Sequence, residues 1–474
     1  MHWIPFTIHP HSFRKIQSFK RIGAMKHNYD VIIIGAGPAG IFASITLAKM
    51  GIGRVLLVEQ GKDIDKRDRR SGRDILCGWG GAGAYSDGKL NLSTEVGGFL
   101  SEFIPSKKLE ILLQEADKIY LRYGAPEKIF GANLPEIETL SANAQRVGLT
   151  FVPTMIRHMG TENCVSVVEK MRQDLTDKIS IKTECRVEEI VTHKNEVTGV
   201  RLADGQVIDS HFVVAAPGRT GAGWMQSQAD LLNLSSVPSP VDIGLRIEAP
   251  APIIEPLTKE AYEAKLIYYS KTFDDKVRTF CMNPYGEVVL EQSDDIITVN
   301  GHSYAQKKSD NTNFALLVSS TFTDPFHDPI KYGRYIASLA NMLGKGAIIQ
   351  RLGDLLAGRR STEKRIEKCI TRPTLHTATP GDLSFVLPYR YLKDITEMLE
   401  ILDNLAPGIF SRHTLLYGVE VKFYSHRIKL TDNLESDVKS LFIVGDGAGI
   451  TRGLIQASIS GMVAGKEIAG RLKG

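Results

Sequence analysis

A glycine-rich turn between an apolar strand and a helix constrains this 474-residue chain more than any other feature. Residues 31–34 form a continuously apolar, β-branched run, which is typical of a strand buried on both faces. The run ends on GAGPAG at 35–40, a GxGxxG spacing, and continues into a segment with helical apolar periodicity. A second apolar run at 55–58 closes on Glu59, about 20 residues beyond the glycines. This order predicts a dinucleotide-binding βαβ unit.

Each part of the unit has a physical role at a bound pyrophosphate. Gly35 allows a tight turn, Gly37 lets the backbone approach the phosphates, and Gly40 lets the helix pack closely on the strand. The helix N-terminus presents unpaired N–H groups and the positive end of its dipole. Glu59 is expected to accept hydrogen bonds from ribose hydroxyls. The residues predicted to bind the cofactor here are Gly35, Gly37, Pro38, Ala39, Gly40, Glu59 and Gln60.

The fingerprint alone does not distinguish NAD from FAD, but the C-terminal end of the chain does. Residues 441–449 read LFIVGDGAG, an apolar strand with a Gly-Asp-Gly turn, and residues 450–461 predict a helix. This segment resembles the C-terminal part of the two-dinucleotide-fold flavoproteins. The resemblance implies that Asp446 binds the ribityl chain and that the following helix points its N-terminus at the flavin. A helix N-terminus suits that position because reduced flavin is anionic at the facing edge.

A third block lies between these two. Asp204-Gly205 predicts a hairpin turn, and the apolar run 212–216 leads to Gly218. The run matches the strand that crosses beneath FAD in the same superfamily, which adds Ala216 and Gly218 to the predicted site. The three blocks in this order predict FAD. Because the sequence has no second strand–GxGxxG–helix unit, we expect no separate NAD(P)H domain, and NAD(P)H stays a candidate transient electron donor.

Residues 77–92, CGWGGAGAYSDGKLNL, are rich in glycine and predict close approach of the backbone to a ligand. With LYGVEVKFYSHRIKL at 416–430 and the segment 441–465, this run resembles a family of bacterial FAD-dependent dehydrogenases of unassigned substrate, often labelled NAD-utilising dehydrogenases. The likeness extends from Asn28 to the C-terminus and implies bound FAD, but it names no substrate. It also implies that FAD is lined by Gly80, Gly81, Ala82, Ser86, Asp87, Gly88, Gly445, Asp446, Gly449 and Arg452.

The order of predicted elements indicates an α/β chain. We expect a doubly wound parallel FAD-binding domain, split in sequence by an inserted, mainly antiparallel α+β domain. The FAD-binding domain would comprise residues 26–224, with a helical segment at 105–147, and residues 431–474. The inserted substrate domain would comprise residues 225–430, with strands at 242–248, 288–290 and 315–320 and a helix over 334–356.

The first 24 residues hold four basic and no acidic side chains, which account for the whole formal charge of +4. The rest of the chain is electrically balanced and gives no nucleic-acid signal. We expect residues 1–25 to be a disordered or non-native extension, with translation starting at Met25. The sequence predicts no membrane span, because no window of about 18 apolar residues occurs. It predicts no metal site, and five cysteines without paired spacing favour the reducing cytoplasm.

Bound flavin carries the redox chemistry, so the protein has to orient a substrate and move protons. Residues 418–427 alternate as a strand whose polar face would present Glu420, Lys422 and His426, and these are the candidate catalytic residues. The same alternation is expected of the solvated face of an edge strand. His302 and His376 are further candidate bases, at positions also typical of turn or surface histidines.

Three functions fit these patterns. The first is an FAD-dependent oxidoreductase that dehydrogenates or reduces a small organic substrate by hydride transfer at flavin N5. The second is a flavin monooxygenase or saturase of an apolar substrate, which shares the layout of one fingerprint and an inserted sheet. The third is a flavin-binding electron carrier without substrate turnover. The polar strand at 418–427 favours a substrate site and therefore an enzyme.

Overall fold

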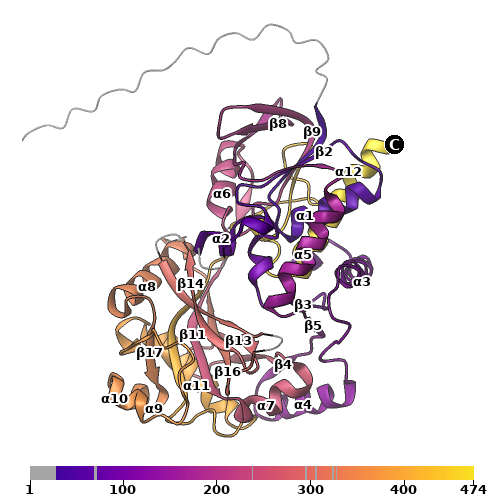
Figure 1. The fold of residues 1–474 in the computed structure, drawn as a ribbon. Helices are drawn as coiled ribbons and strands as arrows, with labels where there is room; N and C mark the ends of the chain where they lie inside the picture. Colours follow the sequence, from indigo (N-terminus) through magenta and orange to yellow (C-terminus); the bar gives the residue numbers. More distant parts are fainter. Residues whose placement is uncertain are drawn as a thin grey trace, which may run out of the picture.

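Two β-sheets of seven and eight strands organise the protein, and Figure 1 shows them as two lobes joined at a narrower middle. The computed structural model describes residues 28–68, 72–237, 239–293, 296–304, 307–322, 325–326 and 328–474. The predicted extension at 1–25 lies outside the described residues. The predicted fold class, α/β with a parallel FAD-type sheet and a second antiparallel sheet, is confirmed.

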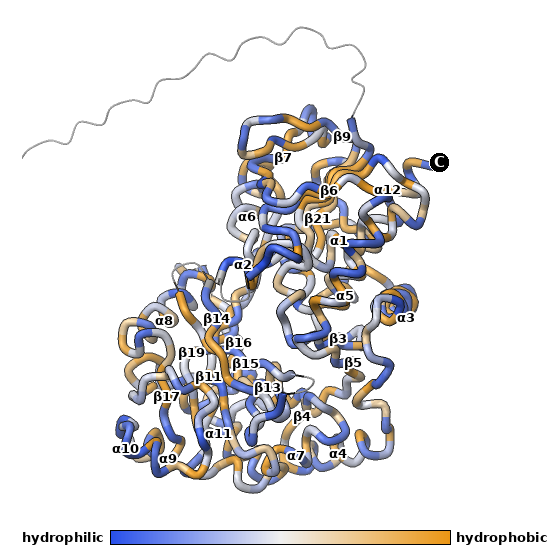
Figure 2. Tube along the Cα trace, viewed as in Figure 1, coloured by the Kyte–Doolittle hydropathy of each residue, from blue (hydrophilic) through white to orange (hydrophobic). Residues whose placement is uncertain are grey.

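The first sheet grows from the predicted βαβ unit. Strand β1 (Tyr29–Ile34) lies between β2 (Val55–Val58) and β9 (Val207–Ala215), and all three are parallel. Residues 31–34 and 55–58 are buried, as their unbroken apolar character predicts. In Figure 2 hydrophobic colour concentrates along these strands near β6 and β21. The sheet is completed by β6 (Ser180–Lys182), β21 (Leu441–Ile443), and the antiparallel β7 (Val187–His193) and β8 (Glu196–Leu202).

Helix α1 (Pro38–Lys49) packs along the C-terminal helix α12 (Leu454–Lys473). Gly461 and Gly465 make this packing close, because a Cβ at Gly461 would overlap the Ala39 carbonyl and one at Gly465 would crowd Thr46. The contact brings the two ends of the described chain into one lobe. The same lobe holds α2 (Gly72–Leu76), α3 (Ser106–Arg122), α5 (Thr161–Leu175), α6 (Ala222–Leu231) and the strand pair β3 (Lys89–Asn91) and β5 (Ile156–His158). Helix α4 (Leu134–Arg146) lies instead in the second lobe, where Ile137 and Ala144 join the apolar core of the second sheet (Figure 1).

The second sheet has the order β18-β17-β19-β11-β16-β13-β12-β4. Its centre is antiparallel and apolar on the face that α8 and α11 cover. One strand, β4 (Thr150–Val152), comes from the segment predicted for the FAD-binding domain, yet it pairs with β12. The other elements are β11 (Val241–Pro250), β12 (Lys265–Tyr269), β13 (Lys276–Asn283), β16 (Asn311–Ser320), β17 (Ile348–Arg351), β18 (Thr379–Pro380), β19 (Leu415–Lys422), the pairs β14 (Glu287–Ser293) with β15 (Ile296–His302) and β10 (Ser236–Val237) with β20 (Arg427–Ile428), and helices α7 (Ala251–Ala261), α8 (Pro329–Gly344), α9 (Leu352–Leu356), α10 (Glu363–Glu367) and α11 (Tyr389–Leu402).

Three expectations about local structure are wrong. The helix predicted over 334–356 is interrupted by β17, because Lys345 and Gly346 have positive φ and the chain then pairs with β19. The last helix begins at Leu454 rather than at residue 450, since residues 446–448 form a short 3₁₀ turn. The edge-strand interpretation of 418–427 fails, because β19 lies between β17 and β11 and all its residues are buried.

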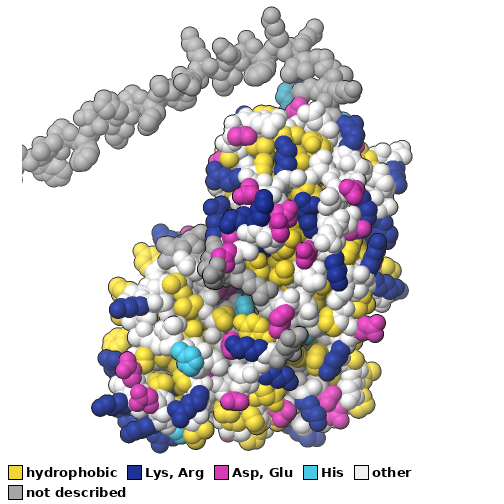
Figure 3. All heavy atoms as spheres, in the orientation of Figure 1, with side chains coloured by type: hydrophobic (Ala, Val, Ile, Leu, Met, Phe, Trp, Pro, Cys, Tyr) yellow, Lys and Arg dark blue, Asp and Glu magenta, His cyan; other side chains and the backbone are white. Residues whose placement is uncertain are grey.

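The surface carries no segregated charge on the face drawn in Figure 3, where basic, acidic and hydrophobic side chains are interspersed. Among the described residues, no helix combines the length and the apolar character that crossing a bilayer requires.

Asp394 gives the second lobe a pH-dependent stability. This side chain of α11 is fully buried, and burial, aided by the Asp275 carboxylate, raises its pKa to about 6. In the unfolded chain an aspartate has a pKa of about 3.9. The protonated form of Asp394 therefore stabilises the folded state fully below that pH, and this stabilisation is lost as the pH rises through about 6. Asp394→Asn should therefore raise the melting temperature at neutral pH and leave it nearly unchanged in acid. Glu400→Gln, at an exposed position of the same helix, is the control; equal melting temperatures of Asp394→Asn and wild type at neutral pH would contradict the prediction.

Candidate functional site

The turn between β1 and α1 forms a cradle around Gly37. A Cβ at Gly35 would overlap the Ala216 carbonyl oxygen, and one at Gly40 would overlap the Gly35 carbonyl oxygen. A Cβ at Gly37 meets no atom within 4 Å, although this residue is the N-cap of α1. Gly35 and Gly40 are thus required by the packing of the protein itself, whereas Gly37 faces open space at a helix N-terminus, where a pyrophosphate fits.

Glu59 ties the turn to the glycine-rich run. One carboxylate oxygen accepts the Ala36 N–H at 2.8 Å, and the other accepts the N–H groups of Gly61 at 2.8 Å and Gly78 at 3.1 Å. The sequence predicts that Glu59 binds ribose hydroxyls. The oxygen that accepts only Ala36 keeps a lone pair for that role, since a carboxylate oxygen has two acceptor positions. Gln60 follows directly, partly buried beside this carboxylate.

The glycine-rich run folds back onto the dinucleotide turn. Gly80 donates to the Ala36 carbonyl at 2.8 Å, and a Cβ at Gly81 would lie 3.0 Å from the Cα of Gly37. The buried Arg67 fixes the run by donating to the carbonyls of Trp79 and Gly81. No local motif marks Arg67, because its five-donor side chain acts on carbonyls that only the fold brings together. The structure places Gly80 and Gly81 beside Gly37, with Ala82 and Ser86 in the same 80–86 segment.

The C-terminal block meets the same turn from the other side. A Cβ at Gly445 would lie 3.0 Å from the Cβ of Ala39, and one at Gly447 would lie 3.1 Å from the Gly218 carbonyl oxygen. The Asp446 carboxylate accepts from Thr451 at 2.7 Å and lies 3.7 Å from Nε of Arg219. The predicted blocks therefore converge at the carboxyl ends of β1, β9 and β21, which is where ligands bind in open parallel sheets.

Gly449 and Arg452 lie farther along this block, toward the second lobe. A Cβ at Gly449 would lie 2.7 Å from the carbonyl oxygens of Ser425 and His426. The Arg452 guanidinium carbon lies 3.4 Å from the centroid of the Tyr424 ring. Two of the residues assigned to FAD thus also contact the segment that follows β19.

A network of buried charges lies on the central strands β11 and β19 of the second sheet. Arg246 of β11 is fully buried and donates through Nε and Nη2 to both oxygens of Glu420, at 2.7 and 2.8 Å. Lys422 lies 3.1 Å from Glu420 and 3.5 Å from Glu291 of β14. Burial alone would raise the pKa of Glu420 and lower that of Lys422, but the opposite charges reverse both shifts. Both candidate residues are therefore fixed in their charged forms, which suits orientation more than proton transfer.

His426 does not join this network. The strand alternation that placed it on the same face ends at Lys422, and residues 423–426 are outside β19. Of the two other histidine candidates, His302 lies within electrostatic reach of Asp87 and Glu291, and burial lowers its pKa. His376 is exposed.

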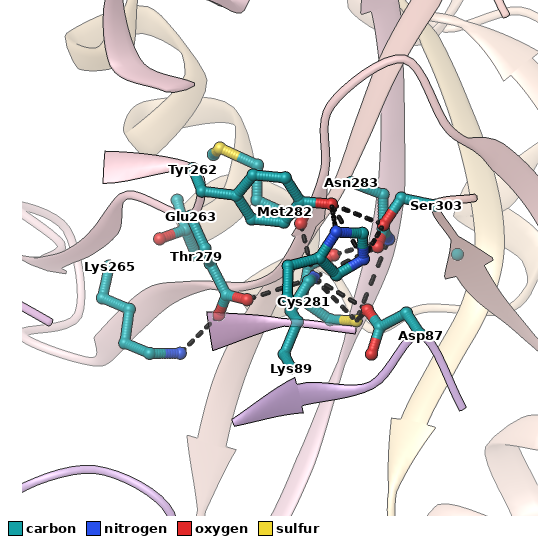
Figure 4. Close-up of polar contacts among 12 residues, drawn as sticks. Asp87, Lys89, Tyr262, Glu263, Lys265, Thr279, Cys281, Met282, Asn283 and Ser303 are labelled. Atoms are coloured by element: carbon teal, nitrogen blue, oxygen red, sulfur yellow. Dashed lines mark hydrogen bonds and ion pairs between the residues drawn. The ribbon is translucent and has the colours of Figure 1, made fainter. Parts of the chain in front are cut away.

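Asp87 of the glycine-rich run faces the second lobe rather than the dinucleotide turn. Lys89 lies 2.9 Å from Asp87 and 3.1 Å from Glu263, and it donates to the carbonyl of Met282 and to Asn283. Figure 4 shows these groups converging on Lys89 from both lobes. The neighbouring Gly88 packs against Met159 and Cys164 of the first-lobe core, whereas Lys89 reaches Glu263 of the second lobe.

Tyr262 brings two side chains to this junction through an unusual backbone. Its φ of 59° and ψ of −50°, with the Glu263 N–H donating to the Ala261 carbonyl at 2.6 Å, define a γ-turn of positive φ. Such turns are strained and cluster at functional sites. The Tyr262 hydroxyl lies 3.0 Å from the His158 ring nitrogens and 2.9 Å from the Ser303 hydroxyl.

The environment sets the protonation of this pair. Burial, with a further contribution from Lys89, lowers the pKa of His158 to about 4, and burial raises the pKa of Tyr262. At neutral pH a neutral imidazole therefore faces a protonated phenol, an arrangement that can accept and return a proton. The sequence did not reveal the pair, because His158, Tyr262 and Ser303 belong to no local motif.

Two family models match this chain. Residues 30–318 match the model described as FAD dependent oxidoreductase, and residues 240–423 match FAD-dependent protein, C-terminal domain-like. The chain belongs to the FAD-dependent oxidoreductase family. The oxidoreductase is thus an enzyme that uses FAD, and the open cradle at Gly37 and the anion-binding end of α1 fit that cofactor.

Individual proteins similar to the oxidoreductase are distant. An uncharacterized protein of Clostridium beijerinckii is 27% identical, with 96% of this chain and 83% of that protein covered. A digeranylgeranylglycerophospholipid reductase of Methanococcus vannielii is 23% identical, with 44% of this chain and 55% of the relative covered. Among solved structures, glycine oxidase from Bacillus cereus is 13% identical, with 94% of this chain and 95% of that chain covered at a TM-score of 0.38.

Replacing Gly37 tests the cradle without disturbing the fold. Gly37→Val should fold normally, since the added Cβ meets no atom within 4 Å, but it should be purified without FAD because valine fills the phosphate position. The flavin-to-protein absorbance ratio measures the loss. Gly223→Val, which also places its Cβ in open space, should keep FAD. Stoichiometric FAD in folded Gly37→Val would refute this placement.

Proposed function

We propose that the oxidoreductase is a dehydrogenase or reductase of a small polar organic substrate and that it belongs to the bacterial FAD-dependent dehydrogenases often labelled NAD-utilising. Bound FAD supplies the hydride acceptor or donor at N5. The observation that carries the proposal is the buried charged network of Arg246, Glu420 and Lys422 on the second sheet. Glu291, which pairs with Lys422, also interacts electrostatically with Arg219 at the carboxyl end of β9. NADH or NADPH is the proposed electron donor.

This network favours a polar substrate over an apolar one. Lys422 keeps a little exposure to water, and a ligand that removes this contact has to offer a polar partner in exchange, which an apolar ligand cannot. The name of the Methanococcus relative points instead to reduction of a glycerophospholipid, but that likeness covers 44% of this chain. A monooxygenase or saturase of an apolar substrate is therefore the second candidate, and an electron carrier without turnover is the third.

We infer that the predicted cofactor residues hold FAD through backbone rather than through side chains. Gly37 and the start of α1 would receive the pyrophosphate, Glu59 the ribose, and Asp446 the ribityl chain. The support is their convergence at one sheet edge.

We likewise propose the domain division at 26–224, 225–430 and 431–474, with β4 added to the inserted sheet. A cytoplasmic location is proposed as well, because it suits five free thiols.

Tyr262 and His158 are the groups that we propose for proton transfer. A dehydrogenation that sends a hydride to the cofactor also releases a proton from the substrate. Neutral His158 can take that proton through the Tyr262 hydroxyl, and the reverse path serves reduction. Glu420 and Lys422 then orient the substrate by charge, because each is locked in its ionised form by a partner.

Anaerobic mixing tests the function directly. NADH or NADPH should bleach the flavin absorbance of the purified enzyme. A polar metabolite from a screened set should then restore the absorbance if the enzyme reduces it, or should bleach the oxidised enzyme if the enzyme dehydrogenates it. In air, a monooxygenase would couple oxygen uptake to a hydroxylated apolar product, which we do not expect. Response to an artificial acceptor alone, with no metabolite affecting the flavin spectrum, would favour the electron carrier.

Tyr262→Phe tests the proton path once a reacting compound is identified. Turnover should fall roughly 10²- to 10⁴-fold, the usual contribution of general acid–base catalysis, while FAD content stays unchanged. Wild-type activity should be lost as the pH falls through the His158 pKa of about 4, because the imidazole must be neutral to accept a proton. Tyr269→Phe, at an exposed position, is the control. Full activity of Tyr262→Phe would exclude this role.

A further inference from the structure

Arg452 differs from the arginines that pair with carboxylates of the second sheet. The guanidinium of Arg246 is neutralised by Glu420, and that of Arg278 lies 2.5 Å from Asp242. The Nε and Nη2 atoms of Arg452 are buried, yet neither has a hydrogen-bond partner in the part of the chain that the structure describes. A buried unpaired donor is costly, and one of a charged group especially so.

The unpaired edge has a specific chemistry. Nε and Nη2 form the side of the guanidinium that receives both oxygens of one carboxylate. The same edge binds both oxygens of a carboxylate in Arg246 with Glu420, Arg157 with Asp117, Arg351 with Asp354 and Arg390 with Asp275. In Arg452 this edge is shaped and buried for the same kind of partner.

The guanidinium is also held in place before any ligand arrives. Its carbon lies 3.4 Å from the centroid of the Tyr424 ring and 4.6 Å from that of the Phe99 ring, contacts that orient an arginine plane. The Arg452 backbone N–H donates to the Gly97 carbonyl at 2.7 Å, and the Phe99 N–H donates to the Ile450 carbonyl. The Tyr424 hydroxyl is itself fixed on Asp242. These contacts fix the orientation of the Tyr424 ring and of the guanidinium, and with it the direction of the unpaired Nε–Nη2 edge.

The position of Arg452 connects this edge to the reaction. It immediately precedes α12, whose N-terminal cap is Gly453, and it follows the Asp446 turn by a few residues. The positive end of a twenty-residue helix therefore adds to the attraction for an anion at this place. The sequence resemblance assigns Arg452 to the flavin, but its stacking on Tyr424 places it against the segment that leads from the second sheet.

We propose that Arg452 recognises a carboxylate on the substrate, so that the small polar compound of the proposed function is a carboxylic acid. The inference rests on that proposed function. Arg452 would fix the acid group by two parallel N–H···O hydrogen bonds and leave the reacting part of the molecule toward the flavin. The uncharged amide of the same acid offers one acceptor oxygen in place of two and no charge, and should bind much more weakly.

Calorimetric titration of the FAD-loaded enzyme with acetate and benzoate, and with acetamide and benzamide, tests the proposal. The acids should bind and the amides should not. Arg452→Met should weaken acid binding about ten- to a hundredfold, the loss expected for charge-assisted hydrogen bonds, and Arg452→Lys should restore only part of it because lysine lacks the fork. Arg427→Met removes a neighbouring arginine that pairs with Glu102 and should leave acid binding unchanged.

Each result has one meaning for the proposal. Loss of FAD from folded Arg452→Met would overturn it and assign the open edge to the flavin. Failure of the wild-type enzyme to bind either acid, or equal binding by Arg452→Met, would overturn it as well. Bleaching of the wild-type flavin by NADH or NADPH is measured separately, so the proposed function can stand when the carboxylate site fails.

Discussion

The close contact between α1 and α12 is the constraint on which the site depends. Gly461 and Gly465 let the two helices approach until a side chain would overlap backbone. This approach brings the turn that follows β21 against the turn that follows β1, although some 400 residues separate them. Since both turns end parallel strands of one sheet, their backbone N–H groups and helix ends face a common space, and a dinucleotide can bridge them.

Ion pairs compensate the buried charges of the second sheet and of the junction between the lobes. Arg246, Lys422 and Lys89 are all deeply buried, and each is balanced by at least one carboxylate. Desolvating these charges is tolerable only because the partners come from different strands with good geometry. The unpaired edge of Arg452 stands out against this balance, and the neutral His158–Tyr262 pair is held by hydrogen bonds.

Sequence patterns located the cofactor better than the chemistry around it. Gly35, Gly37 and Gly40 could be assigned roles because a local strand–turn–helix geometry fixes what each glycine must avoid. Glu420 and Lys422 were found from strand alternation, and the structure does put them on one buried network, but the same alternation wrongly included His426. Arg67, His158 and Tyr262 gave no signal, because each acts on partners that are distant in sequence.

Local patterns of residues suffice to specify the FAD-type α/β fold, the parallel core strands and the glycine turn, since these follow from nearest-neighbour geometry and from the burial of continuous apolar runs. Which charges meet between the two sheets depends on long-range packing. The strand order places β19 in the interior, β4 in the second sheet and Asp87 at the junction of the lobes. Such pairings depend on contacts across long sequence separations. The residue pattern of a single strand does not indicate which side chains of other elements that strand will face.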